Sequence, residues 1–183
     1  MEPICIYFST TVKVRRDKTI RIDTELVSRR FAMTEILFME NNVFLRDVID
    51  EDLPIFFEQQ NDPLANEMAG FPARNRDAFM AHWAKIRVKE NGLRKTIVYS
   101  GQVAGNMLSF DMEGHREVGY WLGREFWGKG IASKALAEFL SYETTRPLYG
   151  VVVTHNVGSR RVLEKCGFQI VREEGDEIVL LLE

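Results

Sequence analysis

The stretch WGKGIASKAL, residues 127–136, places two glycines around a lysine and then continues into residues that favour a helix. A helix that begins in such a loop has unpaired backbone N–H groups at the positive end of its dipole. Glycine lets a ligand approach this backbone closely, and phosphate groups commonly bind there. The stretch therefore predicts a phosphate-binding loop at the start of a helix.

The loop resembles two standard nucleotide-binding motifs only in part. Gly123 to Lys129 spells GxxxxGK, but a P-loop needs Ser or Thr at the next position to bind magnesium, and Gly130 stands there. GKGIAS begins like GxGxxG, but Ser133 occupies the third glycine position and the preceding strand does not open a βαβ unit. A P-loop nucleotide binder is thus a remote alternative, and a simple tight turn is a second one.

The segments on both sides of the loop predict an α+β domain. Upstream, three β-rich runs are separated by turns at Ser100-Gly101-Gln102 and Glu113-Gly114, which indicates an antiparallel meander. Further strands are expected at VFLRDV (43–48), LYGVVVTHN (148–156, buried), FQIVRE (168–173) and EIVLLL (177–182). Helices are expected at DLPIFFEQQ (52–60), RDAFMAHWAKIRVKEN (76–91), KGIASKALAEFLSYE (129–143, about four turns) and SRRVLEKCG (159–167), and a loop or broken helix at residues 61–75.

The composition limits the class of protein. The chain has 183 residues, with 24 Lys plus Arg, 27 Asp plus Glu and a net charge of -3, which argues against a nucleic-acid binder. Residues 1–38 keep neither helical nor strand periodicity for long, so they are expected to be an N-terminal extension of unknown role before a domain at 39–183.

Neither metal binding nor a membrane location is expected. The two cysteines, Cys5 and Cys166, are far apart, and the three histidines show no metal-ligand spacing. No apolar run approaches the roughly 18 residues of a spanning helix, and no basic segment precedes an apolar stretch. These features predict a cytoplasmic protein without a metal site.

A family resemblance gives the loop a more specific meaning. Residues 127–132 resemble the Q/R-x-x-G-x-G/A motif of the GNAT acetyltransferases, with Trp127 in place of Gln or Arg. NVGSRRVLEKCGF, residues 156–168, resembles the N-x-x-S-x-x-x-L-x-x-x-G-F signature of the RimJ/RimL-like branch, which contains ribosomal-protein N-terminal acetyltransferases. The match extends to EVGYWLGREFWGKG, which runs from the last strand of the meander into the loop. The three motifs stand in family order, and the resemblance covers residues 43–183.

The resemblance implies both a fold and an activity. The implied fold is a mixed, mostly antiparallel sheet flanked by helices and splayed between its fourth and fifth strands. Acetyl-CoA would bind as co-substrate in this splay, and its acetyl group would move directly to a primary amine, either a protein N-terminus or a small molecule, within a ternary complex. A non-catalytic acetyl-CoA-binding or regulatory module is the alternative, and the protein is expected to be a monomer or homodimer.

The resemblance also assigns cofactor-binding roles. Backbone N–H groups of the loop would bind the pyrophosphate, with the Lys129 side chain facing solvent, and the backbone of Tyr120 and Leu122 would bind the pantetheine arm. Asn156 would contact the arm, or would only cap the following helix. The complete expected set is Tyr120, Leu122, Trp127, Gly128, Lys129, Gly130, Ile131, Ala132, Ser133 and Asn156.

Two catalytic roles are expected from the chemistry of acetyl transfer. The amine must lose a proton, and Glu117 stands on the strand before the splay; His115, Asp111 or an ordered water are the alternatives. Strand alternation places His115 and Glu117 on one face. The departing thiolate needs a donor, and because Leu163 replaces the tyrosine found in many family members, the available hydroxyl is Ser159.

Overall fold

The computed structural model describes residues 42–89 and 91–183. The expected extension at residues 1–38 lies outside these ranges. The helices are α2 (Asp52–Gln60), α3 (Pro63–Ala69), α4 (Arg76–Arg87), the 3₁₀ turn η1 (Arg124–Phe126), α5 (Ile131–Tyr142) and α6 (Val157–Lys165). The strands are β1 (Val43–Asp47), β2 (Arg94–Tyr99), β3 (Gln102–Met112), β4 (His115–Leu122), β5 (Leu148–Val153), β6 (Gln169–Glu174) and β7 (Glu177–Leu182).

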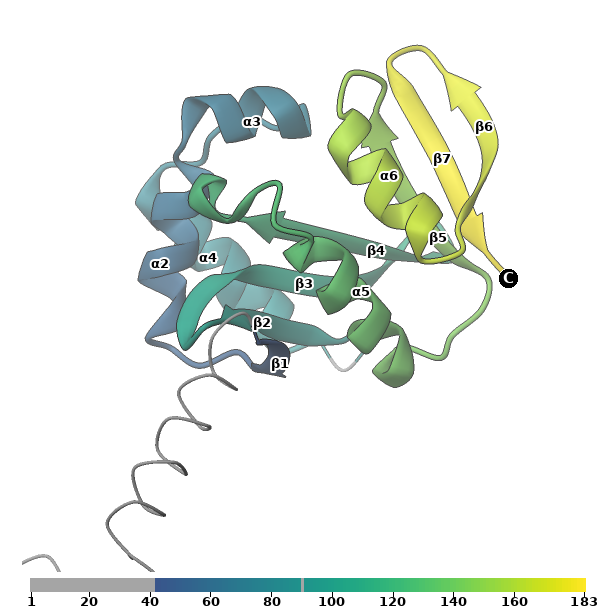
Figure 1. The fold of residues 1–183 in the computed structure, drawn as a ribbon. Helices are drawn as coiled ribbons and strands as arrows, with labels where there is room; N and C mark the ends of the chain where they lie inside the picture. Colours follow the sequence, from purple (N-terminus) through teal and green to yellow (C-terminus); the bar gives the residue numbers. More distant parts are fainter. Residues whose placement is uncertain (1–41, 90) are drawn as a thin grey trace, which may run out of the picture. The chain divides into compact units, whose positions relative to one another are not determined.

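The strands form one seven-stranded sheet in the order β1-β2-β3-β4-β5-β7-β6. All neighbouring pairs are antiparallel except β4 and β5, which are parallel. Helices cover the sheet, with α5 in front and α4 behind it in the view of Figure 1. The expected α+β fold with a mixed, mostly antiparallel sheet is confirmed.

Two short hairpin turns join the antiparallel strands β2, β3 and β4. Ser100 and Gly101 have φ of 49° and 77°, and Glu113 and Gly114 have φ of 48° and 88°. Two central residues with positive φ are typical of type I′ turns, whose twist matches that of the strands they join. The predicted meander of β2, β3 and β4 is therefore confirmed.

The parallel pair is short. β4 and β5 are in register only at Arg116 with Leu148 and at Glu117 with Tyr149, whereas β5 pairs with β7 along its whole length. Beyond these two positions β4 and β5 separate, as expected for a splay between the fourth and fifth strands. The prediction that β5 is buried is wrong for its second half, since Val151 is 39% exposed. Beyond Tyr149, β5 no longer has β4 beside it, so its side chains are more exposed to solvent.

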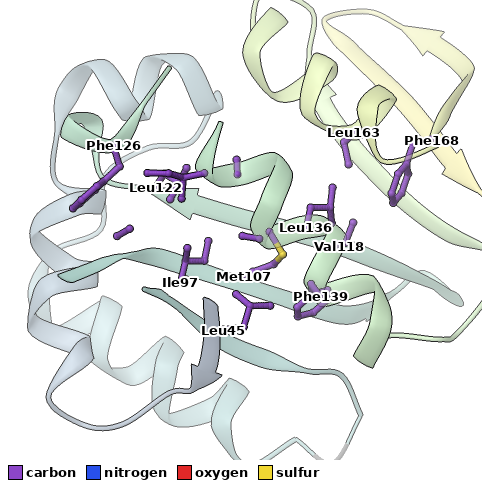
Figure 2. Packing of buried hydrophobic residues seen from close by; sticks show 14 of the residues in the cluster. Leu45, Ile97, Met107, Val118, Leu122, Phe126, Leu136, Phe139, Leu163 and Phe168 are labelled. Carbon is purple, nitrogen blue, oxygen red and sulfur yellow. The ribbon is translucent and has the colours of Figure 1, made fainter. Parts of the chain in front are cut away.

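Two apolar clusters hold the layers together. Ile131, Leu136 and Phe139 of α5 pack on the sheet residues Met107 and Val118 (Figure 2). A second cluster joins α2 and α4 through Leu53, Phe56, Phe79 and Trp83, with Val103 and Leu108 of β3 packed against it. The side chains of β3 are thus shared between two cores, and α5 is fixed against the opposite face of the sheet from α2 and α4.

Local boundaries differ from the sequence expectation in several places; helix α4, for example, ends at Arg87 and not at residue 91. The segment 61–75 contains the two-turn helix α3, where the Asp62 side chain accepts a hydrogen bond from the Ala65 N–H and Pro63 occupies the first turn. Helix α5 has 12 residues and begins at Ile131, so it is shorter than the four turns predicted.

Within the described ranges, no helix is long and apolar enough to cross a membrane.

Candidate functional site

The start of α5 is an exposed row of backbone donors. Gly130 is its N-cap in a left-handed conformation, φ 74°, without any side-chain cap, and Gly128 has φ 73°. The N–H groups of the first turn have no acceptor within the helix, because its ladder begins with Lys134 N donating to Gly130 O at 3.2 Å. A Cβ added at either glycine would meet no atom within 4 Å, so the space beside this backbone is open. The arrangement can bind an anion.

Lys129 does not cover this row of donors. Its Nζ lies 6.0 Å from the centroid of the Tyr99 ring and 5.8 Å from that of Phe126, so the ammonium group rests over two aromatic faces. The residue is exposed, as the sequence analysis expected. The lysine contributes positive charge near the loop while the backbone of the loop stays accessible.

Trp127 ties the loop to the end of β4. Its indole Nε1 donates to the carbonyl of Leu122 at 3.0 Å. Gly123 N donates to Ala104 O of β3, so the N–H and C=O of the preceding Leu122 point to the other edge of β4, where the splay opens. The Leu122 carbonyl thus uses one of its two lone pairs for Trp127, and the Leu122 N–H faces the open edge of β4.

Tyr120 lies two residues earlier and has the same backbone orientation. Because β5 pairs with β4 only at Arg116 and Glu117, the N–H and C=O of Tyr120 have no strand partner. An extended ligand lying between the strands would satisfy them. This placement agrees with the backbone role expected from the sequence.

The far end of the splay is bridged by the segment from α2 to α3. The carbonyl of Gln59 accepts from Trp121 Nε1 on β4 at 3.0 Å, and the carbonyl of Glu67 lies 2.9 Å from His155 Nε2 just after β5. Gly70 packs so closely on β5 that an added Cβ would lie 2.7 Å from Val153 Cγ1. Helix α3 therefore bounds the space between the diverging strands.

Glu117 and His115 meet where the strands separate. Glu117 Oε1 lies 3.0 Å from His115 Nε2, and the His115 ring contacts the ring of Tyr149 at a centroid distance of 4.8 Å. The Glu117 side chain is 13% exposed, whereas that of His115 is 37% exposed. A shielded carboxylate is thus connected to the surface through an imidazole.

Asp111, the third candidate for the base, points to the other face of the sheet. Its Oδ1 lies 3.3 Å from Arg116 Nη1, and Arg116 Nε lies 3.8 Å from the Glu143 carboxylate at the end of α5. Arg116 precedes Glu117 in the strand, so its side chain leaves from the opposite face. The structure brings Glu117 and His115 together and leaves Asp111 apart from them.

The α6 side of the splay carries two hydroxyl groups in contact. Tyr120 OH donates to Ser159 Oγ at 3.0 Å, and burial raises the pKa of Tyr120 to about 12. Asn156 Oδ1 accepts from Ser159 N at 3.0 Å, which makes Asn156 the N-cap of α6. Leu163 is buried and packs against Gly150, so no polar group stands at its position.

Two features of the site were missed by the sequence analysis. Tyr120 was expected to act through its backbone, yet its side chain reaches Ser159, 39 positions away. Gly119 lies between Glu117 and Trp121 on the same strand face, and a Cβ there would meet only the Phe110 ring, at 3.5 Å. A glycine within a strand is the usual sign of close backbone approach, and this signal could have been read from the sequence.

A helix start with free N–H groups lies beside a gap between two strands, and a carboxylate and two hydroxyls line this gap. Such a domain can accommodate an extended, phosphate-bearing ligand. The GNAT acetyltransferase domain model matches residues 42–169. The chain therefore belongs to the GNAT acetyltransferase family. Among the described residues no group of three or more His, Cys, Asp or Glu side chains could hold a metal ion.

Known proteins resemble the chain in sequence and in fold. The YdaF protein of Bacillus subtilis, provisionally named as a ribosomal N-acetyltransferase, is 30% identical over 100 residues, which cover 51% of this chain and 55% of that protein. The match thus spans about half of the length of that relative.

Two solved structures show the fold. A spermidine N-acetyltransferase from Vibrio cholerae, in complex with CoA and spermine, superimposes with a TM-score of 0.64 at 15% identity, over 76% of this chain and 92% of that one. RimL, a ribosomal-protein α-N-acetyltransferase in complex with coenzyme A, gives a TM-score of 0.63 at 16% identity over 78% of this chain and 94% of that one.

Proposed function

We propose that this protein transfers the acetyl group of acetyl-CoA directly to a primary amine. The observation that supports this most strongly is the division of groups between the two faces of β4. Glu117 stands on one face, and the hydroxyl pair of Tyr120 and Ser159 stands on the other. A proton acceptor for the amine and hydrogen-bond donors for the departing sulfur would thus approach the reacting carbon from opposite sides.

The described residues fit acetyl-CoA. Backbone N–H groups between Gly128 and Ser133 would hold the pyrophosphate, and the open edge of β4 at Tyr120 and Leu122 would hold the pantetheine arm. The open space beside the two loop glycines leaves room for the phosphate oxygens. The bound thioester supplies the activated acetyl group.

The protein's own groups then handle the proton of the amine. A C–N bond forms, the C–S bond breaks with its electron pair on sulfur, and the amine loses one proton. Glu117 would accept this proton, and His115, in contact with it and more exposed, would connect the carboxylate to solvent. Asp111 is paired with Arg116 on the other face, so it is not used.

We also propose that the protein belongs to the RimJ/RimL-like branch and acts on a protein N-terminus or a small primary amine. The support is the signature at residues 156–168 together with the similarity to the Bacillus subtilis relative. Asn156 and Ser159 of that signature occupy the first turn of α6, beside the splay.

A screen of amines and N-terminal peptides for CoA release tests the activity. Acetylated product and free CoA should appear in equal amounts with at least one amine, and no release should occur without an amine. If acetyl-CoA binds but no amine is acetylated, the alternative of a non-catalytic acetyl-CoA-binding module is supported. If acetyl-CoA does not bind, both are wrong.

Residues 39–183 are proposed to be the acetyltransferase domain, with residues 1–38 as an N-terminal extension. The observed strand β1 begins at Val43, and the family model begins at residue 42. A protein truncated to begin at Met39 should bind acetyl-CoA with the affinity of the full chain, measured by calorimetry. Loss of folding in the truncated protein, seen by circular dichroism, would show that the first 38 residues belong to the core.

A further inference from the structure

The hydrogen bond between Tyr120 and Ser159 crosses the splay from β4 to α6. Because β4 is a strand and α6 is a helix, they share no backbone ladder, and this hydrogen bond joins their side chains. We infer that Tyr120 is a positioning residue that directs the hydroxyl proton of Ser159 toward the sulfur atom of bound coenzyme A. The inference rests on the proposed function, since it concerns the same site.

The hydrogen-bonding capacity of Ser159 supports this direction. A serine hydroxyl has one proton to donate and two lone pairs. One lone pair of Ser159 accepts from Tyr120 OH, while Asn156 Oδ1 is engaged with the backbone N–H of Ser159. Apart from the bond with Tyr120, the Ser159 hydroxyl makes no hydrogen bond to any other residue that the structure describes. The proton is therefore available to a ligand in the gap.

The donor must be the tyrosine. A phenol is a stronger acid than an aliphatic alcohol and hence the better donor of the pair. Burial raises the pKa of Tyr120 to about 12, so the phenol keeps its proton at neutral pH. Donation from Tyr120 polarises the Ser159 hydroxyl and strengthens the bond that it can make to a negatively charged sulfur.

The protons stay on both hydroxyls during the reaction. An ordinary thiol has a pKa of about 8.5, so a thiolate does not remove the proton from a phenol whose pKa is much higher. When the C–S bond breaks, its electron pair remains on sulfur and the pair of hydroxyls stabilises the charge by hydrogen bonding. Tyr120 thus acts through Ser159 and transfers nothing itself.

The same geometry explains how the site can lack a tyrosine on α6. Leu163 occupies that position, is 2% exposed and packs on Gly150 of β5. The phenol comes from β4 instead and reaches the first turn of α6 from the opposite side of the splay. The hydroxyl that faces the ligand is then a serine supported by a tyrosine.

The test measures the thiol of bound CoA and needs no amine. Hydrogen bonds to the thiolate should lower the pKa of the bound thiol below the free value. The affinity for CoA should then rise with pH between the pKa of the bound thiol and that of the free thiol, and level off above the pKa of the free thiol. Desulfo-CoA lacks the sulfur but keeps the phosphates, so the ratio of the two affinities at each pH isolates the contribution of the thiol. Calorimetry across roughly pH 6 to 9.5 covers this window.

Two substitutions and their combination assign the effect. Ser159→Ala should remove most of the pH-dependent gain in affinity, which we expect to be about tenfold for a one-unit pKa shift. Tyr120→Phe keeps the ring and should reduce the gain about threefold, on the order of a weakened charge-assisted bond. In the Ser159→Ala background, Tyr120→Phe should have no further effect, because its route to the sulfur is already lost.

Tyr142→Phe is the matched control, since it removes an exposed hydroxyl at the far end of α5. The inference is overturned if Tyr120→Phe leaves the pH dependence unchanged, or if it has the same effect with and without Ser159. CoA binding without any pH dependence in the parent also overturns it, while the proposed function survives. Absence of CoA binding would overturn both.

Discussion

The side chains of the eight-residue strand β4 alternate between two faces, and the two faces carry different chemical groups. His115, Glu117 and Trp121 leave from one face, where Trp121 contacts α2 and Glu117 contacts His115. Val118 and Leu122 leave from the other and pack into the core under α5, and Tyr120 reaches α6 from this face. The carboxylate and imidazole face the α2 side, and the phenol faces the α6 side.

In the proposed reaction, the two faces of this strand would act on different substrates. Alternation places the carboxylate and the hydroxyl pair on opposite sides of the backbone, and the edge of the strand between them has N–H and C=O groups without a strand partner. Gly119 lies among the residues on the α2 side and leaves the backbone accessible there. The following predictions test whether the two faces act separately.

Gly130→Asp should have the largest effect, because it should prevent the binding of acetyl-CoA, on which the proposed roles of both faces depend. The substitution places a carboxylate beside donors meant for an anion, in a position with φ 74°. Acetyl-CoA binding measured by calorimetry should fall by at least 100-fold, about 2.7 kcal/mol. Gly101→Asp, at φ 77° in the β2–β3 turn, is the control for backbone strain and should bind normally. Unchanged affinity in Gly130→Asp would contradict the assignment of the loop.

Glu117→Gln should affect only the amine side. General-base catalysis typically contributes 10²- to 10⁴-fold, so a loss of about 100-fold in kcat at neutral pH is expected. The rate should recover partly as rising pH neutralises the amine without help, and acetyl-CoA affinity should be unaffected. Asp111→Asn is the matched control, because Asp111 pairs with Arg116 on the other face. If Glu117→Gln keeps the parent pH–rate profile, His115 becomes the candidate for the base.

Ser159→Ala should affect only the sulfur side. Turnover should fall about tenfold, equivalent to about 1.4 kcal/mol, because a thiolate is a fairly stable leaving group. The pH dependence due to the amine should stay as in the parent, in contrast with Glu117→Gln. A change in that pH dependence would show that the two faces are not independent.

Trp127→Phe should have the smallest effect. It keeps an aromatic ring but removes the indole N–H that donates to Leu122, so the loop loses one contact that holds it before the ligand arrives. The Kd for acetyl-CoA should rise about threefold, which is within the range of one hydrogen bond, and kcat should not change. Trp121→Phe removes an indole N–H from the other face and should leave the Kd unchanged. An unchanged Kd in Trp127→Phe would mean that the loop is held by other contacts.

Local sequence patterns were sufficient for much of the fold. The glycines of the hairpin turns, the alternation along β4 and the Gly167 end of α6 each depend on residues within one turn or strand. The same alternation correctly placed His115 and Glu117 on one face, where the structure shows them in contact. The glycine-rich start of α5 could also be predicted locally, since its glycines and backbone donors are consecutive.

Other features depended on tertiary packing. The short helix α3 forms in a stretch rich in turn residues, with Asp62 as its cap and Gly70 packed on β5, a strand that follows much later in the chain. The partial exposure of β5 follows from the loss of its neighbour beyond Tyr149, although Val151, Val152 and Val153 read as a buried run. A strand's burial depends on what lies beside it, and the sequence of the strand does not contain that information.

By itself the sequence determined the glycine-rich start of α5, the order of the strands and of the helices other than α3, and the face of β4 that carries Glu117. Only the tertiary structure decided that Tyr120 is hydrogen-bonded to Ser159, that Asp111 pairs with Arg116, and that the Leu122 carbonyl accepts a hydrogen bond from Trp127. The physical reason is the range of the interactions. Turns, caps and alternation arise between neighbours in the chain, whereas a side-chain hydrogen bond across the splay exists only after β4 and α6 have been packed at a fixed distance.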